Sequence, residues 1–187
     1  MRHLVLLALA ITNTITWAAP RSEKDTLTNT RYVAKESDIN AANANEAELA
    51  LPDFPAQTAD WFNIYVSKDF KVQPQLLLSS VMIAPDRTVR YVLNIKSAQG
   101  FDNISAEGIR CTDATFNSDP SMYKVFAFGD TINKRWIKTR KAEWRPIGAI
   151  LNTDNKIHSV LYRTFCEDGL PKNIEEMDAR IKVRAGR

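Results

Sequence analysis

Alternation between apolar and polar residues is the strongest structural signal in this chain of 187 residues. Within residues 88–96 every second side chain is apolar, which places these side chains on one face of a strand. A largely apolar run, residues 76–83, precedes it, and the Pro85-Asp86 pair between the two runs is typical of a turn. The pattern therefore predicts an antiparallel hairpin.

Further runs of aromatic and β-branched residues, bounded by glycine, proline or polar turn residues, predict additional strands. They cover residues 61–66, 104–111, 122–128, 135–138 and 157–166. Near the C-terminus, apolar residues recur at helical spacing after Asn173, which can cap a helix. Strands followed by one helix predict an α+β fold, mostly antiparallel β-sheet with a C-terminal helix.

The first 18 residues have the composition of an export signal. Arg2 precedes the apolar run 4–11, and small side chains at Thr16 and Ala18 fit the −3 and −1 positions of a cleavage site. We expect residues 1–18 to be a signal peptide removed after Ala18, which leaves a periplasmic or otherwise exported protein. An uncleaved N-terminal anchor is the alternative. No later apolar run approaches the roughly 20 residues of a membrane-spanning helix, so we expect no transmembrane segment in the mature chain.

The next segment, residues 19–51, has few apolar residues, which predicts a flexible acidic segment with a short helix near residues 40–49. Pro52 and Pro55 then mark the start of a single strand-rich domain, residues 52–187. The formal net charge of +3 is too small to predict nucleic-acid binding, and an exported protein rarely meets nucleic acid.

Cys111 and Cys166 are the two cysteines of the chain. Export places them in an oxidising compartment, so we expect an intramolecular disulfide; two buried free thiols and an intermolecular bridge are the alternatives. The one histidine left after signal removal, His158, lies in a predicted strand without a placed partner for a zinc site or a catalytic triad. The glycines are isolated, so no phosphate-binding loop is predicted. We likewise expect no metal site and no cofactor.

A basic and aromatic stretch, residues 134–145, is the main candidate for ligand binding. The candidate side chains, together with Arg110, are Arg135, Trp136, Lys138, Arg140, Trp144 and Arg145. Cations interleaved with aromatic rings can bind an acidic glycan, lipopolysaccharide phosphate or an acidic protein surface. The alternative is an edge strand whose positive charges prevent aggregation, with both tryptophans in the core.

Glu107 and Asp113 are the carboxylates that could act as an acid–base pair on a glycan. Nothing in the sequence sets their separation, so a structural ion pair of Glu107 with an arginine is the favoured interpretation. The candidate partners are Arg110, Arg140 and Arg145. An envelope hydrolase remains an alternative function, as does a structural or assembly factor that docks through the acidic residues 36–60.

Several of these residues together resemble the cryptic-neisserial-protein-like family of uncharacterised exported proteins of Gram-negative bacteria. The resemblance rests on Arg90-Tyr91, Glu107-Gly108-Ile109-Arg110-Cys111, residues 123–129, Trp136, Arg140, residues 144–147 and Phe165-Cys166. It covers residues 60–166 and implies an envelope location and one disulfide, but no activity or catalytic residue. The overall prediction is a non-enzymatic binding module for an anionic envelope ligand or a protein partner.

Overall fold

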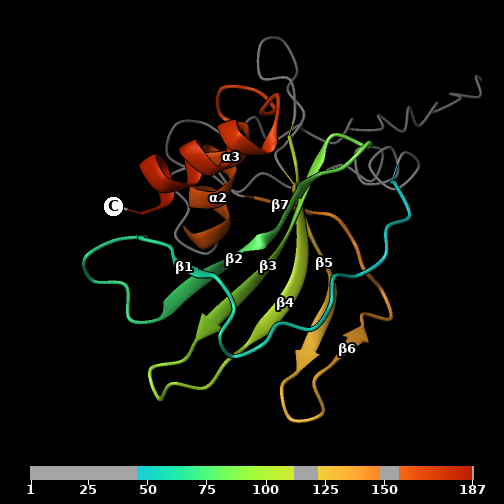
Figure 1. The fold of residues 1–187 in the computed structure, drawn as a ribbon, viewed down its shortest axis with the longest axis vertical. Helices are drawn as coiled ribbons and strands as arrows, with labels where there is room; N and C mark the ends of the chain where they lie inside the picture. The colour runs from blue at the N-terminus through green and yellow to red at the C-terminus, as the bar shows by residue number, and fades with distance from the viewer. Residues whose placement is uncertain (1–45, 112–121, 148–155, 187) are drawn as a thin grey trace, which may run out of the picture.

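The computed structural model describes residues 46–111, 122–147 and 156–186, which form an antiparallel sheet and a group of C-terminal helices (Figure 1). The strands are β1 (Trp61–Asn63), β2 (Gln73–Ile83), β3 (Thr88–Lys96), β4 (Ile104–Arg110), β5 (Met122–Asp130), β6 (Arg135–Lys138) and β7 (Arg145–Pro146). The helices are α2 (Lys156–Cys166), α3 (Ile174–Arg180) and η2 (Ile181–Ala185), a π-helical continuation of α3. The fold is therefore α+β and mostly antiparallel sheet, as the sequence predicts.

The sheet is a meander in which strands that follow each other in the chain are neighbours, from β1 to β6. Strand β7 also pairs with β5, alongside β6. The predicted hairpin is confirmed as β2 and β3, in which Leu76 lies opposite Leu93. Its turn is fixed by Asp86, whose carboxylate accepts hydrogen bonds from the amide and the hydroxyl of Thr88.

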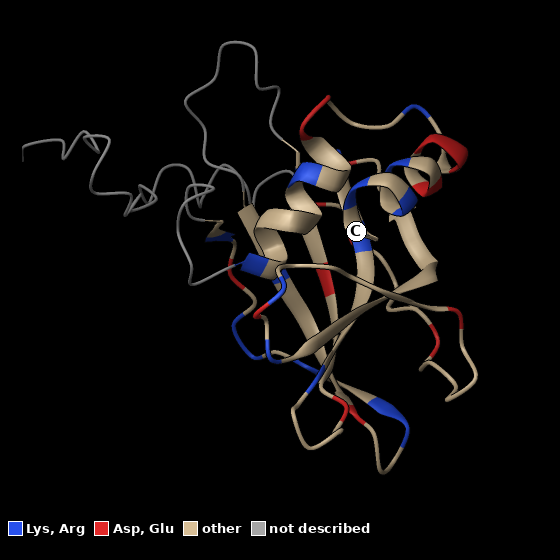
Figure 2. Ribbon diagram, turned by 90° about the vertical axis from the view of Figure 1, so that its left-hand side faces the viewer, with Lys and Arg blue, Asp and Glu red and all other residues tan. Residues whose placement is uncertain are grey.

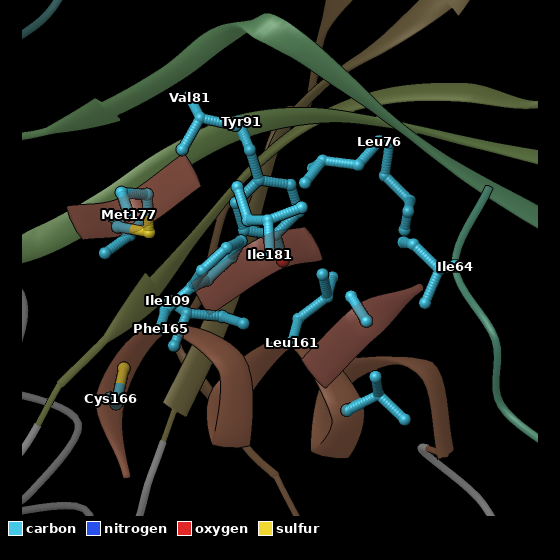
Figure 3. Packing of buried hydrophobic residues seen from close by; sticks show 14 of the residues in the cluster. Ile64, Leu76, Val81, Tyr91, Ile109, Leu161, Phe165, Cys166, Met177 and Ile181 are labelled. Carbon is cyan, nitrogen blue, oxygen red and sulfur yellow. The ribbon is translucent and has the colours of Figure 1, made fainter. Parts of the chain in front are cut away.

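One face of the sheet packs against the three helices and forms the main hydrophobic core (Figure 3). Tyr91 of β3 meets Phe165 of α2 with ring centroids 5.6 Å apart. Leu76 of β2, Leu161 of α2 and Ile181 of η2 are fully buried in the same cluster. Burial of apolar surface between sheet and helices is the main stabilising contribution on this face.

The opposite face of the sheet is covered by irregular chain. Residues 46–52, which we call the strap, run across the strands (cyan in Figure 1). The strap leads into Phe54, whose ring packs on Trp136 of β6 at a centroid distance of 5.3 Å. Leu77 and Val92 form a small core beneath this part of the chain. A helix was predicted near residues 40–49; residues 46–49 are not helical, and residues 40–45 lie outside the described part.

The prediction of a strand over residues 157–166 is wrong, because these residues form the helix α2. Val160, Leu161, Thr164 and Phe165 are buried, which is the spacing of one helical face. The β-branched and aromatic composition of the segment is overridden by its packing against the sheet. The predicted helix after Asn173 is confirmed as α3, and the side chain of Asn173 accepts a hydrogen bond from the amide of Glu176.

The predicted disulfide between Cys111 and Cys166 is confirmed. Cys111 directly follows β4 and Cys166 ends α2, so the bond joins the sheet to a helix. Among the residues that the structure describes, no helix is long and apolar enough to cross a membrane. The predicted signal peptide, residues 1–18, lies outside the described residues.

Candidate functional site

The predicted basic and aromatic stretch lies mainly on β6, at the edge of the sheet. Arg135 is exposed and pairs with Asp130 across the β5–β6 turn, with Nε and Oδ2 3.2 Å apart. Lys138 is exposed, whereas Trp136 is partly buried and donates its indole N–H to the carbonyl of Pro52 at 2.7 Å. Trp136 therefore holds the strap through its polar edge.

Arg110, Arg140 and Arg145, all candidates for ligand binding, do not lie together on one face of the sheet. Arg110 lies opposite Met122 and Arg145 lies opposite Tyr123. Because neighbouring residues of β5 point to opposite faces, Arg110 and Arg145 also lie on opposite faces of the sheet. Arg140 is exposed in the turn after β6. Figure 2 likewise shows Lys and Arg at separate positions on strands, turns and helices of the described residues.

Trp144 cannot present its ring to a ligand, because only 2% of the residue is exposed. It packs with Met122 and Phe126 on the strap-covered face, and the Phe126 and Trp144 rings meet edge to face. Its indole Nε1 has no hydrogen-bond partner among the described residues. Trp144 was a candidate binding residue with a core position as the alternative, and its burial agrees with the core position.

Glu107 lies in β4 on the helix-covered face and is almost fully buried. Its carboxylate accepts hydrogen bonds from the hydroxyls of Ser105 at 2.6 Å and Tyr91 at 3.1 Å. The third partner is Nε2 of His158 in α2, at 2.9 Å. The structure thus gives Glu107 a histidine partner in place of the predicted arginines.

The groups around Glu107 tie α2 to the sheet. His158 stacks on Tyr123 of β5, with ring centroids 3.8 Å apart. Burial and the negative charge of Glu107 raise the pKa of Tyr91 well above its ordinary value, so the phenol stays protonated and donates. A buried carboxylate with three partners serves to position a helix. Asp113, the other predicted carboxylate, lies outside the described residues.

A cleft of about 740 Å³ lies beside the strap-covered face. It opens where residues 54–58 pass the ends of β3 and β4 and the β5–β6 turn. Its wall includes the rings of Phe54 and Trp61, and its polar groups include Asn94, Lys96, Asp102 and Lys134. An apolar wall with a few convergent polar groups is the usual composition of a ligand site.

Hydrogen bonds and an ion pair among the polar groups of the cleft hold some of these groups in place. Asn94 is buried and donates a hydrogen bond to Asp102 at 2.7 Å, while it accepts one from the amide of Asn103. Lys96 lies 3.8 Å from the same Asp102 carboxylate. Lys134 is exposed, and no ion pair joins it to another residue of the described ranges. One amine at the cleft is therefore available to an anion.

Sequence reasoning missed a second group of cations, which lies beneath the strap. Arg90 of β3 and Lys124 of β5 both lie opposite Gly108 of β4, so the three positions form a row across the sheet. Arg90 lies over the ring of Phe126, with its guanidinium carbon 4.0 Å from the centroid. We call Arg90, Lys124, Phe126 and Trp144 the cation–aromatic row. The one local sign of this row in the sequence was Gly108, because a glycine inside a strand can mark the close approach of other groups.

No group of three or more His, Cys, Asp or Glu side chains in the described part of the chain is arranged to hold a metal ion. The cleft and the cation–aromatic row are the two features of this face that gather polar and aromatic side chains. The residues that carry the family resemblance lie on both faces of the sheet: Arg90, Gly108, Trp136 and Trp144 on the strap-covered face, and Tyr91 and Glu107 beneath the helices.

Comparison with known proteins confirms that resemblance. The chain matches the CNP1-like family over residues 40–182. It is 44% identical to Cryptic neisserial protein 1 of Neisseria gonorrhoeae (strain ATCC 700825 / FA 1090) over 193 residues, which cover 100% of this chain and 95% of that relative. No solved structure matches the chain. The match spans the whole sheet and most of the helical part, and the chain therefore belongs to the CNP1-like family.

Proposed function

We propose that this chain is an exported cell-envelope protein that binds an anionic ligand in the cleft and does not transform it. The observation that carries this proposal is the combination, in one cleft of about 740 Å³, of two aromatic rings with the amines of Lys96 and Lys134. Export is supported by the sequence of residues 1–18, which has the n-region, apolar run and small-residue site of a signal peptide.

The chemistry of the cleft favours an acidic glycan. Sugar rings pack well against aromatic side chains such as Trp61 and Phe54, both of which are partly exposed here. The hydroxyls of Thr58 and Thr131 line the same cleft and can exchange hydrogen bonds with sugar hydroxyls. The ammonium of Lys134 supplies a counter-charge for a carboxylate or phosphate on the sugar.

The test is binding of two anionic probes and one neutral probe to the full-length protein by isothermal titration calorimetry. The probes are lipopolysaccharide, a uronic-acid oligosaccharide and a neutral oligosaccharide of equal length, each measured at several salt concentrations. We expect Lys96→Ala/Lys134→Ala to lower the affinity for an anionic probe by about tenfold, because each lost charge removes roughly 0.5–1 kcal/mol. The two anionic probes separate phosphate from carboxylate recognition.

The matched control is Lys138→Ala/Arg140→Ala, which removes two exposed cations of the β6 region outside the cleft. This variant should bind like the wild type and show the same dependence on salt. Equal affinities of wild type and Lys96→Ala/Lys134→Ala for both anionic probes would overturn the cleft as the site. If only the control variant lost affinity for the anionic probes, the exposed edge strand β6 would be the binding site instead of the cleft.

A further inference from the structure

The strap is held on the sheet by polar contacts at its two ends. At the first end, the Glu46 carboxylate lies 2.5 Å from the ammonium of Lys124, and the amide of Ala47 donates to Asp86 at 2.9 Å. At the other end, the Pro52 carbonyl accepts the indole N–H of Trp136 at 2.7 Å. Between these contacts, the strap residues face apolar and aromatic groups of the sheet.

The close packing of the surface beneath the strap requires that residue 108 is a glycine, which has no side chain. A Cβ atom at Gly108 would lie 2.9 Å from Cδ of Arg90 and 3.1 Å from Cε2 of Phe126. Glycine at this position therefore lets the Arg90 stem and the Phe126 ring lie flat across β4. The Lys124 ammonium approaches the same ring at 5.5 Å and the Trp144 ring at 5.7 Å. The result is a groove with a cationic and aromatic floor.

The two cations of this floor differ in where their counter-charges come from. Arg90 is paired with Asp86, four residues before it in the same hairpin. Lys124 is paired with Glu46, which is 78 residues away in sequence and lies on the strap. A nearly buried ammonium without a counter-ion is strongly unfavourable. Lys124 therefore makes the groove selective for a segment that brings a carboxylate to this point.

The strap does not fill its groove. A cavity of about 100 Å³ remains between strap residues 49–52 and a floor that includes Met82, Arg90 and Phe126. Met82 is still 42% exposed. Residues 46–52 have no helical or strand structure, so few backbone hydrogen bonds bind them to the sheet. A segment with these properties opens at low free-energy cost compared with the helices.

We propose that this groove is a receptor for an extended acidic peptide of another protein, and that the strap occupies it in cis as an exchangeable ligand. The peptide carries a carboxylate that pairs with Lys124. Apolar residues follow three to six positions later, as Leu49, Leu51 and Pro52 follow Glu46 in the strap. This inference rests on the cation–aromatic row and is independent of ligand binding in the cleft.

The test uses a fluorescent synthetic peptide with the sequence of residues 46–55, added to the full-length protein and followed by fluorescence anisotropy. Glu46→Gln removes the carboxylate of the strap but leaves the groove intact, so this variant should bind the peptide about tenfold more tightly than the wild type. Glu48→Gln is the matched control, because Glu48 is an exposed acid of the same strap. It should behave like the wild type.

Two further measurements identify the contact. A peptide with Gln in place of its first Glu should lose its affinity for Glu46→Gln protein, and Glu46→Gln/Lys124→Met should not bind the original peptide. The indole N–H signal of Trp136 in a nitrogen-15 NMR spectrum reports the Pro52 contact directly. It should shift when the strap leaves, which gives a readout that does not depend on the stability of the Lys124 variant.

The proposal is overturned if Glu46→Gln and Glu48→Gln bind the peptide equally and the Trp136 signal is unchanged in both. The strap would then be a fixed part of the fold. Dimerisation of the wild type that rises with concentration and shifts the same Trp136 signal would assign the groove to the strap of a second copy. That result would overturn the assignment to a different protein.

Discussion

The two faces of the sheet are closed in different ways. The helix-covered face buries a continuous apolar cluster, and the Cys111–Cys166 disulfide and the Glu107–His158 contact fasten α2 to the strands. The strap-covered face buries Arg90 and Lys124 under an extended segment that lacks helix and strand structure. One face is fixed by a large apolar cluster and a covalent bond, and the other by two small apolar clusters and a few polar contacts.

The contacts of the helix-covered face contribute mainly to the stability of the fold. On the strap-covered face, we propose, the contacts allow another carboxylate-bearing segment to replace the strap. Apolar burial contributes in proportion to the area removed from water and has no preferred partner chain. A buried ammonium, in contrast, pairs with any carboxylate that is correctly placed. The partner of Lys124 is therefore selected by its charge and its position, and it need not belong to the same chain. We therefore expect changes on the helix-covered face to alter global unfolding, and changes on the other face to act more on the strap.

The largest expected effect is that of removing the disulfide. In Cys111→Ala/Cys166→Ala, the free energy of unfolding should fall by about 4 kcal/mol, because the bond closes a loop with a sequence separation of 55 residues. Urea unfolding of the oxidised wild type and the variant measures this difference. Reduced wild type is the control and should match the variant. A loss below about 1 kcal/mol would mean that the helices hold this face without covalent help.

A smaller effect is expected from Gly108→Ala on the strap-covered face. The added methyl group should displace Arg90 and Phe126 and lower the free energy of unfolding by about 1–3 kcal/mol, as overpacking usually does. Urea unfolding again gives the value. In a Phe126→Leu background the same substitution should cost less, since the ring that it meets at 3.1 Å is gone. An equal cost in both backgrounds would contradict the close packing of the row.

The smallest effect concerns the pH dependence of the strap through Asp86. Burial raises the pKa of Asp86, but hydrogen bonds from the Thr88 side chain, the Ala47 amide and Arg90 outweigh it, so the net pKa lies below its ordinary value. The ionised carboxylate therefore stabilises the folded state above the unfolded pKa of about 3.9, and this contribution is lost as the pH falls further. We expect the Trp136 indole signal to report strap release in that acidic range.

Asp86→Asn separates this effect from other titrations. The variant should lose about 1 kcal/mol of strap binding at neutral pH, the net contribution of a typical hydrogen bond. Its release in the acidic range should be weaker than that of the wild type, because the Asp86 carboxylate is gone. An unchanged pH profile in Asp86→Asn would show that Asp86 does not control the strap.

Local signals in the sequence predicted most of the sheet. The β2–β3 hairpin, the strands β4 to β6 and the Asn173 cap each depend on residues that are close in the chain, so alternation, turn chemistry and capping were sufficient. Helix α2 was misassigned because its β-branched and aromatic residues suit a strand. Its buried positions Val160, Leu161 and Phe165 nevertheless follow a helical period.

The candidate sites could not be predicted in the same way. The cation–aromatic row depends on the register that sets Arg90 and Lys124 opposite Gly108, and a register between strands is not visible in one sequence. Arg90 was correctly placed on the polar side of its strand, but its burial depends on the strap. The cleft combines residues 54–58 with the ends of distant strands, so no contiguous motif marks it.

Phe54 connects the cleft to the contact that holds the strap. Its ring lines the cleft and packs on Trp136, whose indole holds the strap at Pro52. The position of Phe54 in the cleft wall is therefore connected, through one aromatic contact and one hydrogen bond, to the position of the strap. Displacement of the strap in the peptide experiment is therefore expected to alter this wall of the cleft as well.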